Sequence, residues 1–164
     1  MAQAINLSRR NLIRGRANSA TLPLRPPGAV PEALFADQCT SCGDCIAICP
    51  QSIVFKGSAG YPEVDFRRGE CTFCSRCIDI CTEDALLRET QPPWRLEMRL
   101  TDACLAKQQV VCQTCGDACE AEAIRFRPQA GSVSLPLIDQ DVCTGCGACI
   151  TACPQDALRA VAHG

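Results

Sequence analysis

Apolar and polar residues alternate in two separate parts of the chain, and each part contains a turn with glycine. The first part runs from residues 52–56 through the turn 57–60 to residues 61–66. The second runs from residues 123–127 through 128–131 to residues 132–138. Isoleucine, valine, leucine and phenylalanine in these flanks favour strands on either side of a turn. The pattern predicts two similar β-hairpins and therefore an internal repeat.

The rest of the chain contains only short apolar runs. Short helices are predicted near residues 45–48 and 149–152, and no run reaches the roughly eighteen residues of a membrane-spanning helix. Adjacent prolines in residues 90–94 stop both helix and strand, so this stretch is predicted to be a linker. Trp94, at its end, either packs between the two halves or is an ordinary buried tryptophan. These boundaries divide the chain into residues 1–33, 34–91 and 92–164.

Cysteine makes up sixteen of the 164 residues, a density at which it decides the fold class. Three interpretations compete. Disulfides would indicate a secreted protein. Zinc sites usually use C-x2-C pairs separated by a longer gap. Iron–sulfur clusters use three closely spaced thiolates and a fourth further along the chain.

The cysteines fall into four groups of four, with none left over. Three groups have the spacing C-x2-C-x2-C-x3-C, and proline follows two of these. The remaining group has a gap of seven residues after its first cysteine. The groups are Cys39, Cys42, Cys45 and Cys49; Cys71, Cys74, Cys77 and Cys81; Cys104, Cys112, Cys115 and Cys119; and Cys143, Cys146, Cys149 and Cys153.

This spacing indicates [4Fe-4S] clusters, because a tight loop brings three thiolates to three irons of one cluster. The fourth cysteine is predicted to start a short helix and to point away, toward the other cluster of a two-cluster unit. The predicted ligand sets are Cys39, Cys42, Cys45 with Cys81; Cys71, Cys74, Cys77 with Cys49; Cys143, Cys146, Cys149 with Cys119; and Cys104, Cys112, Cys115 with Cys153. The expected fold is α+β, with two tandem ferredoxin-like two-cluster modules of short hairpins and short helices, preceded by a basic N-terminal arm.

The group that starts at Cys104 has the weaker pattern. One interpretation is a fourth [4Fe-4S] cluster with a longer loop between its first two ligands. The other is that Cys104 is a small buried residue and that the site is incomplete. Three clusters are predicted without this group, and four with it.

Charge is unevenly distributed along the chain. The first 31 residues contain five arginines and no acid, whereas the rest of the chain has a net charge of −7. An acidic body disfavours binding to nucleic acid. The stretch 8–16, SRRNLIRGR, resembles a twin-arginine export signal, but arginines and prolines interrupt the apolar segment that such a signal needs. We therefore expect the arm to remain uncleaved in the cytoplasm.

The arm has two interpretations. It is either a basic tail without a partner or a recognition segment that folds on binding. In the second case its arginines would contact an acidic patch of the partner, supported by two aliphatic side chains on one face of a short helix. The residues expected to take part are Arg9, Arg10, Leu12, Ile13, Arg14 and Arg16.

Catalysis by the protein itself is not expected. The only histidine, His163, is the penultimate residue, and no nucleophile motif, phosphate-binding loop or dinucleotide fingerprint occurs. If every cluster has four thiolate ligands, no iron is open to a substrate. One-electron chemistry at the clusters remains.

The chain resembles the NapF family of ferredoxin-type proteins, bacterial polyferredoxins of the periplasmic nitrate reductase system. The resemblance lies in residues 8–16, in the cysteine groups, and in four short segments. These segments are Arg25-Pro26-Pro27, Gly60-Tyr61-Pro62 between the first two cysteine groups, Asp102-Ala103-Cys104-Leu105-Ala106 and Phe126-Arg127-Pro128. It implies a cytoplasmic protein that associates with the precursor of the nitrate reductase catalytic subunit and assists its iron–sulfur maturation before export.

Three classes of function therefore remain. The first is a maturation factor that gives the precursor electrons or cluster components. The second is an electron-transfer subunit of another oxidoreductase complex. The third is a binding module whose clusters are only structural.

Overall fold

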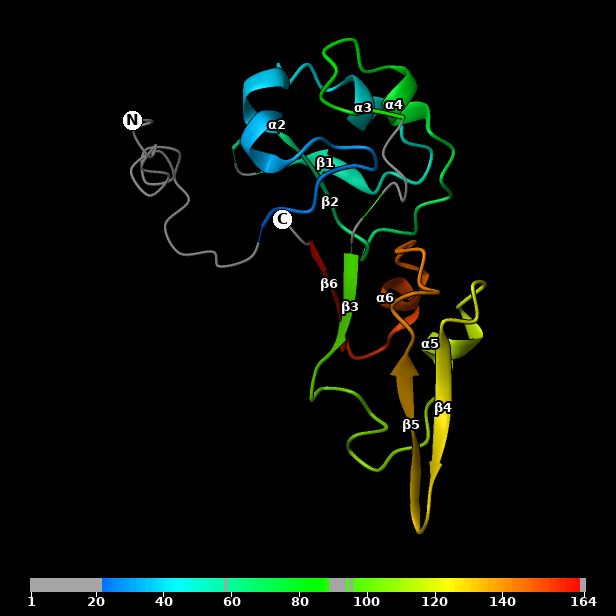
Figure 1. The fold of residues 1–164 in the computed structure, drawn as a ribbon. Coiled ribbons are helices and arrows are strands. Elements are labelled where there is room, and N and C mark those ends of the chain that lie inside the picture. The colour runs from blue at the N-terminus through cyan, green and yellow to red at the C-terminus, as the bar shows by residue number, and fades with distance from the viewer. Residues whose placement is uncertain (1–21, 58, 89–93, 95, 163–164) are drawn as a thin grey trace, which may run out of the picture.

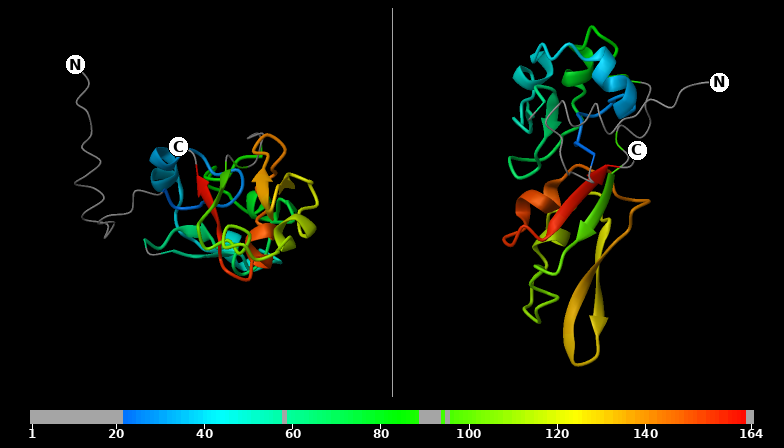
Figure 2. Two further views of the ribbon diagram at one scale, coloured as in Figure 1. Left: turned by 90° about the horizontal axis from the view of Figure 1, so that it is seen from below. Right: turned by 90° about the vertical axis from the view of Figure 1, so that its left-hand side faces the viewer.

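The computed structural model describes residues 22–57, 59–88, 94 and 96–162. Within these residues the chain forms two modules of short helices and two-stranded sheets, stacked one on the other (Figures 1 and 2). This is the expected α+β architecture. Residues 1–21, which contain the arginines and aliphatic residues of the expected recognition segment, lie outside the described part.

The first module contains three helices and one hairpin. In chain order its elements are α2 (Glu32–Gln38), α3 (Asp44–Ala47), β1 (Val54–Lys56), β2 (Pro62–Val64) and α4 (Arg76–Asp79). The second module contains β3 (Leu96–Leu100), α5 (Thr114–Asp117), β4 (Ile124–Gln129), β5 (Ser132–Ile138), α6 (Ala148–Ala152) and β6 (Leu158–Ala162).

Both predicted hairpins are present. β1 and β2 are antiparallel with Val54 opposite Val64, and β4 and β5 are antiparallel with Ile124 opposite Ile138. The second hairpin is longer, and it extends from the end of the molecule that lies away from the first module (Figure 1). The alternation of apolar and polar residues therefore predicts both hairpins correctly.

An antiparallel contact between its two ends closes each module, and the sequence pattern did not predict it. In the second module, β3 pairs with β6 in antiparallel register, with Leu96 opposite Ala162. In the first module, an isolated bridge joins Ala29 to Leu86. In both cases the two ends of a module are hydrogen-bonded to each other.

The expected boundary after residue 33 does not coincide with the packing of the chain. The main-chain oxygen of Leu24 accepts a hydrogen bond of 2.8 Å from Val64 in β2, and Val30 donates one of 3.1 Å to Ala85. Arg25, counted with the basic arm from its sequence, is only 7% exposed. Residues 24–33 thus pack as part of the first module.

The prediction that the fourth cysteine of each group starts a helix is wrong. The helix precedes it: α3 ends before Cys49, and Cys153 follows α6 with an extended backbone. Proline follows these two cysteines and disfavours helix at the residue before it, but α4 and α5 end at the same place before cysteines that no proline follows. Three residues further on, each group has a residue with positive φ: Ser52, Asp84, Glu122 and Asp156. The same turn therefore follows all four groups, with or without the proline.

In the described part of the chain, no helix has the length and apolar character needed to cross a membrane.

Candidate metal centres

The cysteines gather into four sets, which we call centres 1 to 4. Each set consists of three cysteines from one group and the last cysteine of another. Centre 1 is Cys39, Cys42, Cys45 and Cys81; centre 2 is Cys71, Cys74, Cys77 and Cys49; centre 3 is Cys143, Cys146, Cys149 and Cys119; centre 4 is Cys104, Cys112, Cys115 and Cys153. All sixteen cysteines are free thiols in the structure.

Centre 1 lies in the first module, at the end away from the second module. Burial raises the pKa of Cys45 to about 12, and the negative charges of Cys39, Cys77, Cys42 and Cys81 add to this effect. Cys45 therefore interacts electrostatically with all three other members of its own centre and also with Cys77 of centre 2. The two centres of the module are neighbours.

Centre 2 surrounds a cavity of about 290 Å³. All four of its cysteines line this cavity, and Ile53, Val54 and Phe73 are among the apolar residues that line it with them. Burial raises the pKa of Cys71 and of Cys77 to about 11. Four thiols thus line one partly open, largely apolar space.

Centre 3 has the most buried cysteine of the second module. Burial raises the pKa of Cys149 to about 12, and Cys143, Cys146, Cys115 and Cys119 raise it further. Three of these four are members of centre 3, and Cys115 belongs to centre 4. The second module therefore repeats the pair of neighbouring centres found in the first.

Centre 4 gathers around a small pocket. Cys104, Cys112, Cys115 and Cys153 all line it, together with apolar residues from β3, β5 and β6. Burial raises the pKa of Cys115 to about 11, and Cys104 is the first of the charged neighbours that raise it further. The structure thus brings Cys104 to the other three cysteines despite the gap of seven residues.

The loops of centres 1 to 3 share one local conformation. The residue two positions after the first cysteine has positive φ in each: Ser41, Phe73 and Gly145. Its amide donates to the first sulfur, as Phe73 does to Cys71 at 3.4 Å. A left-handed residue then precedes the helix in all three: Gly43, Ser75 and Gly147. Hydrogen bonds to a cluster's sulfur ligands are one of the factors that set its reduction potential.

The loop of centre 4 departs from this conformation. Gln113, which precedes α5, has φ −128° where the other groups have a left-handed residue. Between the first two cysteines the chain turns through Gln109, which has φ +64°. Gln108 donates to the Cys104 carbonyl at 3.2 Å, so the inserted residues form their own turn. Among the sulfurs of this centre, that of Cys153 accepts a hydrogen bond from the amide of Ala157 at 3.3 Å.

Four cysteines in each centre are the donor set of a [4Fe-4S] cluster. Among the described residues, no three histidine, cysteine or acidic side chains are close enough to hold one metal ion. In a tetrahedral zinc site with bonds of 2.3 Å the sulfurs lie about 3.8 Å apart. The thiolates of a cubane each bind a different iron, so they converge on a larger group. Iron would also compensate the burial of four thiolates, which is otherwise unfavourable.

Exposure differs between the four loops. Cys42 and Cys74, the second cysteines of the first two groups, are exposed, whereas Cys45, Cys77 and Cys149 are buried. Centres 1 and 2 thus each have one ligand position open to solvent.

The scan against known families finds two matches. The family described as "4Fe-4S dicluster domain" matches residues 38–85, and the family described as "4Fe-4S binding domain" matches residues 136–159. The first range contains all eight cysteines of the first module, and the second contains Cys143 to Cys153.

The chain is also similar to curated proteins over nearly its whole length. It is 43% identical to "Ferredoxin-type protein NapF" of Haemophilus influenzae, with 93% of each chain covered. It is 40% identical to the protein of the same name in Escherichia coli K12, with 95% of each chain covered. It is 31% identical to "Methylamine utilization ferredoxin-type protein MauM" of Methylobacillus flagellatus, with 87% of this chain and 68% of the relative covered.

Proposed function

We propose a function for this chain from its family, since the chain belongs to the NapF family of ferredoxin-type proteins. In this proposal the protein holds four [4Fe-4S] clusters and serves the maturation of a periplasmic nitrate reductase. Centres 1 to 4 would each hold one cluster through their four cysteines. When bound, these clusters supply reversible one-electron transfer.

The observation that carries this proposal is the convergence of the cysteines. Centres 2 and 4 each place four thiols around one pocket, and in both cases the fourth thiol comes from the other group of the module. That interleaving is the arrangement of two-cluster ferredoxins. In centres 1 and 3, the pKa values of Cys45 and Cys149 are raised by the charges of the other cysteines expected in the same centre.

The partner that we propose is the cytoplasmic precursor of the nitrate reductase catalytic subunit. The protein would bind it before export and give it electrons or cluster components, and would act without catalysis of its own. The body is acidic and loaded clusters add negative charge, so the basic arm is the segment suited to an acidic patch on the precursor. Arg9, Arg10, Arg14 and Arg16 would contact that patch, with Leu12 and Ile13 beside them.

The alternative is an electron-transfer subunit of another oxidoreductase complex. The similarity to a protein named for methylamine utilization favours this candidate, because it extends the same cysteine arrangement to a different system. A stable complex with an oxidoreductase that already contains its cofactors, rather than with a precursor that lacks them, would support this alternative.

The test is capture of partners from anaerobic cytoplasm, with iron content measured on the captured complex. Replacing Arg9 and Arg10 by alanine should weaken binding of the precursor, more at low salt than at high salt, because salt screens exposed charges. The iron content should not change. The matched control replaces Arg67 and Arg68, an arginine pair of the first module whose side chains are 67% and 53% exposed. Equal binding by both double variants and the wild type would contradict the role of the arm.

A further inference from the structure

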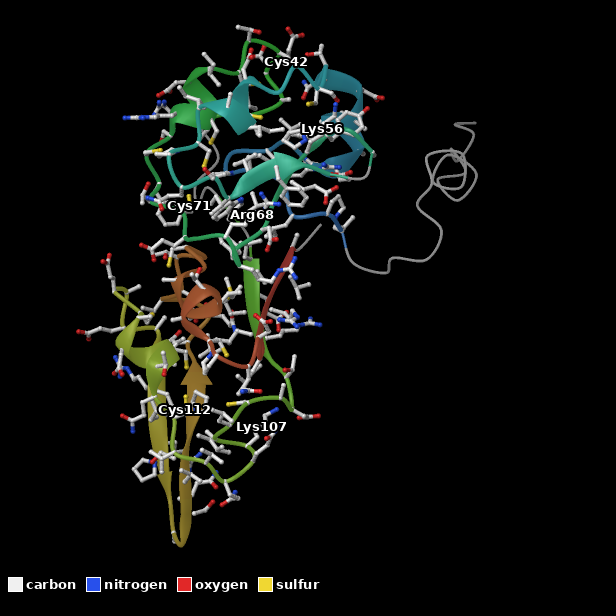
Figure 3. All side chains as sticks on the ribbon, turned by 180° about the vertical axis from the view of Figure 1, so that it is seen from behind. Cys42, Lys56, Arg68, Cys71, Lys107 and Cys112 are labelled. Atoms are coloured by element: carbon white, nitrogen blue, oxygen red, sulfur yellow. The ribbon has the colours of Figure 1, made fainter. Side chains whose placement is uncertain are left out.

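The two modules contact each other through their metal-binding loops. The amide of Cys71 in centre 2 donates a hydrogen bond of 2.8 Å to the carbonyl of Cys146 in centre 3. The hydroxyl of Thr151 in α6 donates one of 2.6 Å to the carbonyl of Phe66 in the first module. Figure 3 shows Cys71 at the end of the first module that faces the second, with Cys42 at the opposite end.

A close approach of Gly147 and Phe66 accompanies these hydrogen bonds. Gly147 has φ +84°, and a Cβ atom there would lie only 2.1 Å from the Phe66 ring. The ring is 3% exposed and lies edge-on to Trp94, with the ring centroids 5.3 Å apart. Trp94 also packs against Phe73 of the centre 2 loop, at 6.0 Å between centroids. The ring therefore has little room to move, and only glycine fits opposite it.

These contacts place the four centres in one order. Within each module the two centres are neighbours, because they share their cysteine groups: Cys49 ends the group of centre 1 and lines the cavity of centre 2, and Cys153 ends the group of centre 3 and lines the pocket of centre 4. Between the modules, centre 2 meets centre 3 at Cys71 and Cys146. Cys112 of centre 4 lies farther from the first module than α6 does (Figure 3). The order is centre 1, centre 2, centre 3, centre 4.

We infer that electrons pass between the two modules at the hydrogen bond from Cys71 to Cys146, and that Gly147 and Phe66 are positioning residues which hold this contact. The inference rests on the proposed function, because it requires clusters at centres 2 and 3. One electron moves, the centre that gives it is oxidised and the centre that receives it is reduced; no bond breaks and no proton moves. The initial electron comes from a low-potential one-electron reductant, which is dithionite in the experiment below.

The physical reason is the distance dependence of electron tunnelling. Tunnelling weakens exponentially as the separation of donor and acceptor grows, and a hydrogen-bonded main chain carries it better than an open gap. Both partners in this hydrogen bond are themselves proposed ligand residues.

The experiment compares Gly147→Ala with Gly43→Ala. Both glycines precede a helix in a metal-binding loop and both have positive φ, +84° and +91°, so alanine strains the backbone similarly. Only at position 147 does the added Cβ meet a ring; at position 43 nothing lies within 4 Å. The difference between the variants therefore reports the contact with Phe66.

The readouts are iron per chain and the magnetic coupling between reduced clusters, seen as broadening of the electron paramagnetic resonance spectrum of the dithionite-reduced protein. We expect both variants to keep the iron of the wild type. Gly147→Ala should lose the part of the broadening that arises between modules, and Gly43→Ala should keep it. Adding Phe66→Leu to Gly147→Ala makes room for the new methyl group and should restore the broadening.

The possible failures are distinguishable. A wild-type protein without clusters would contradict the proposed function. Full iron content with the same broadening in Gly147→Ala as in the wild type would overturn the inference alone. If Gly147→Ala keeps less iron than Gly43→Ala, the test uses Thr151→Val instead, which removes only the hydrogen bond to Phe66. Unchanged broadening in Thr151→Val would also overturn the inference.

Discussion

The indole nitrogen of Trp94 donates a hydrogen bond to the main-chain oxygen of Arg25, 3.0 Å away and 69 positions apart in the sequence. The guanidinium of the same arginine makes two hydrogen bonds of 2.8 Å to Glu32 and one of 3.0 Å to the carbonyl of Pro62. It also lies over the ring of Phe35, 4.8 Å from the centroid. Arg25 therefore joins α2 to β2 through its side chain and binds Trp94 through its main chain.

Arg25→Ala should destabilise the protein by about 2–4 kcal/mol, because it removes a buried cation that is paired and hydrogen-bonded. Arg25→Lys should recover only part of this loss, since lysine lacks the planar fork that binds both oxygens of Glu32. Chemical denaturation of the anaerobic protein measures both. The control is Arg67→Ala, whose side chain is 67% exposed and which should change stability by less than about 0.5 kcal/mol. Equal midpoints for Arg25→Ala and the control would contradict the prediction.

Cys104→Ser should remove iron from centre 4 and spare the other centres. Four cubanes contain about sixteen irons per chain, so the variant should contain about twelve, or about fifteen if a three-iron form remains. Anaerobic iron analysis and the redox spectra measure this. Ala103→Ser, which places the same side chain on the exposed neighbour of Cys104, is the control and should keep all the iron. If the two variants hold equal iron, Cys104 is not a ligand.

Removal of iron by a chelator should unfold most of the chain. The core contains few large side chains; Phe35, Ile53 and Leu158 are among the largest that are fully buried. Cys45, Cys77 and Cys149 belong to the same core, so the metal centres take up much of its volume. Small modules with a metal in the core commonly fold only when it is bound. A far-ultraviolet circular dichroism spectrum of the iron-free protein that stays close to that of the loaded protein would show that folding is independent of the clusters.

Glu122→Val should destabilise the second module by about 1–2 kcal/mol, because Glu122 has φ +51° and a β-branched residue is strongly disfavoured there. Glu122→Gly should be neutral or stabilising for the converse reason. The matched control is Glu120→Val, an exposed position nearby that is not among the positive-φ residues. Thermal unfolding under anaerobic conditions measures all three variants. A valine that is equally tolerated at both positions would contradict the role of the turn.

The cysteine spacing predicted which thiols lie together, because the ligand loops are local and repeat the same geometry. It did not predict the strands β3 and β6. Leu, Glu, Met and Arg in Leu96–Leu100 are good helix formers, and Leu158–Ala162 contains two alanines, so neither segment has an intrinsic preference for a strand. Each is extended because the other is its partner. This is an interaction across nearly the whole second module, and no local pattern contains it.

Arg25 was missed for a similar reason. By sequence it is one of five arginines in a stretch without acids, which indicates a solvated segment. Its burial depends on Glu32, on the carbonyl of Pro62 and on Trp94, which come together only in the folded module. The prediction that the fourth cysteine of each group starts a helix was also wrong, because the helix lies before that cysteine and the turn after the cysteine ends it.

The pairing of β3 with β6 places the two ends of the second module side by side, with Leu96 opposite Ala162. Such a module can be circularly permuted: a short connection could join these ends, and the chain could be opened instead at the turn between β4 and β5, where a side chain on Gly131 would meet no neighbour within 4 Å. Cys143, Cys146 and Cys149 of centre 3 would then leave the ribosome before Cys104, Cys112 and Cys115 of centre 4, and Cys119, the fourth member of centre 3, would come last. Their positions in space depend on the strand pairing and the loops, so the order of synthesis and the order of the centres in the molecule can be varied independently.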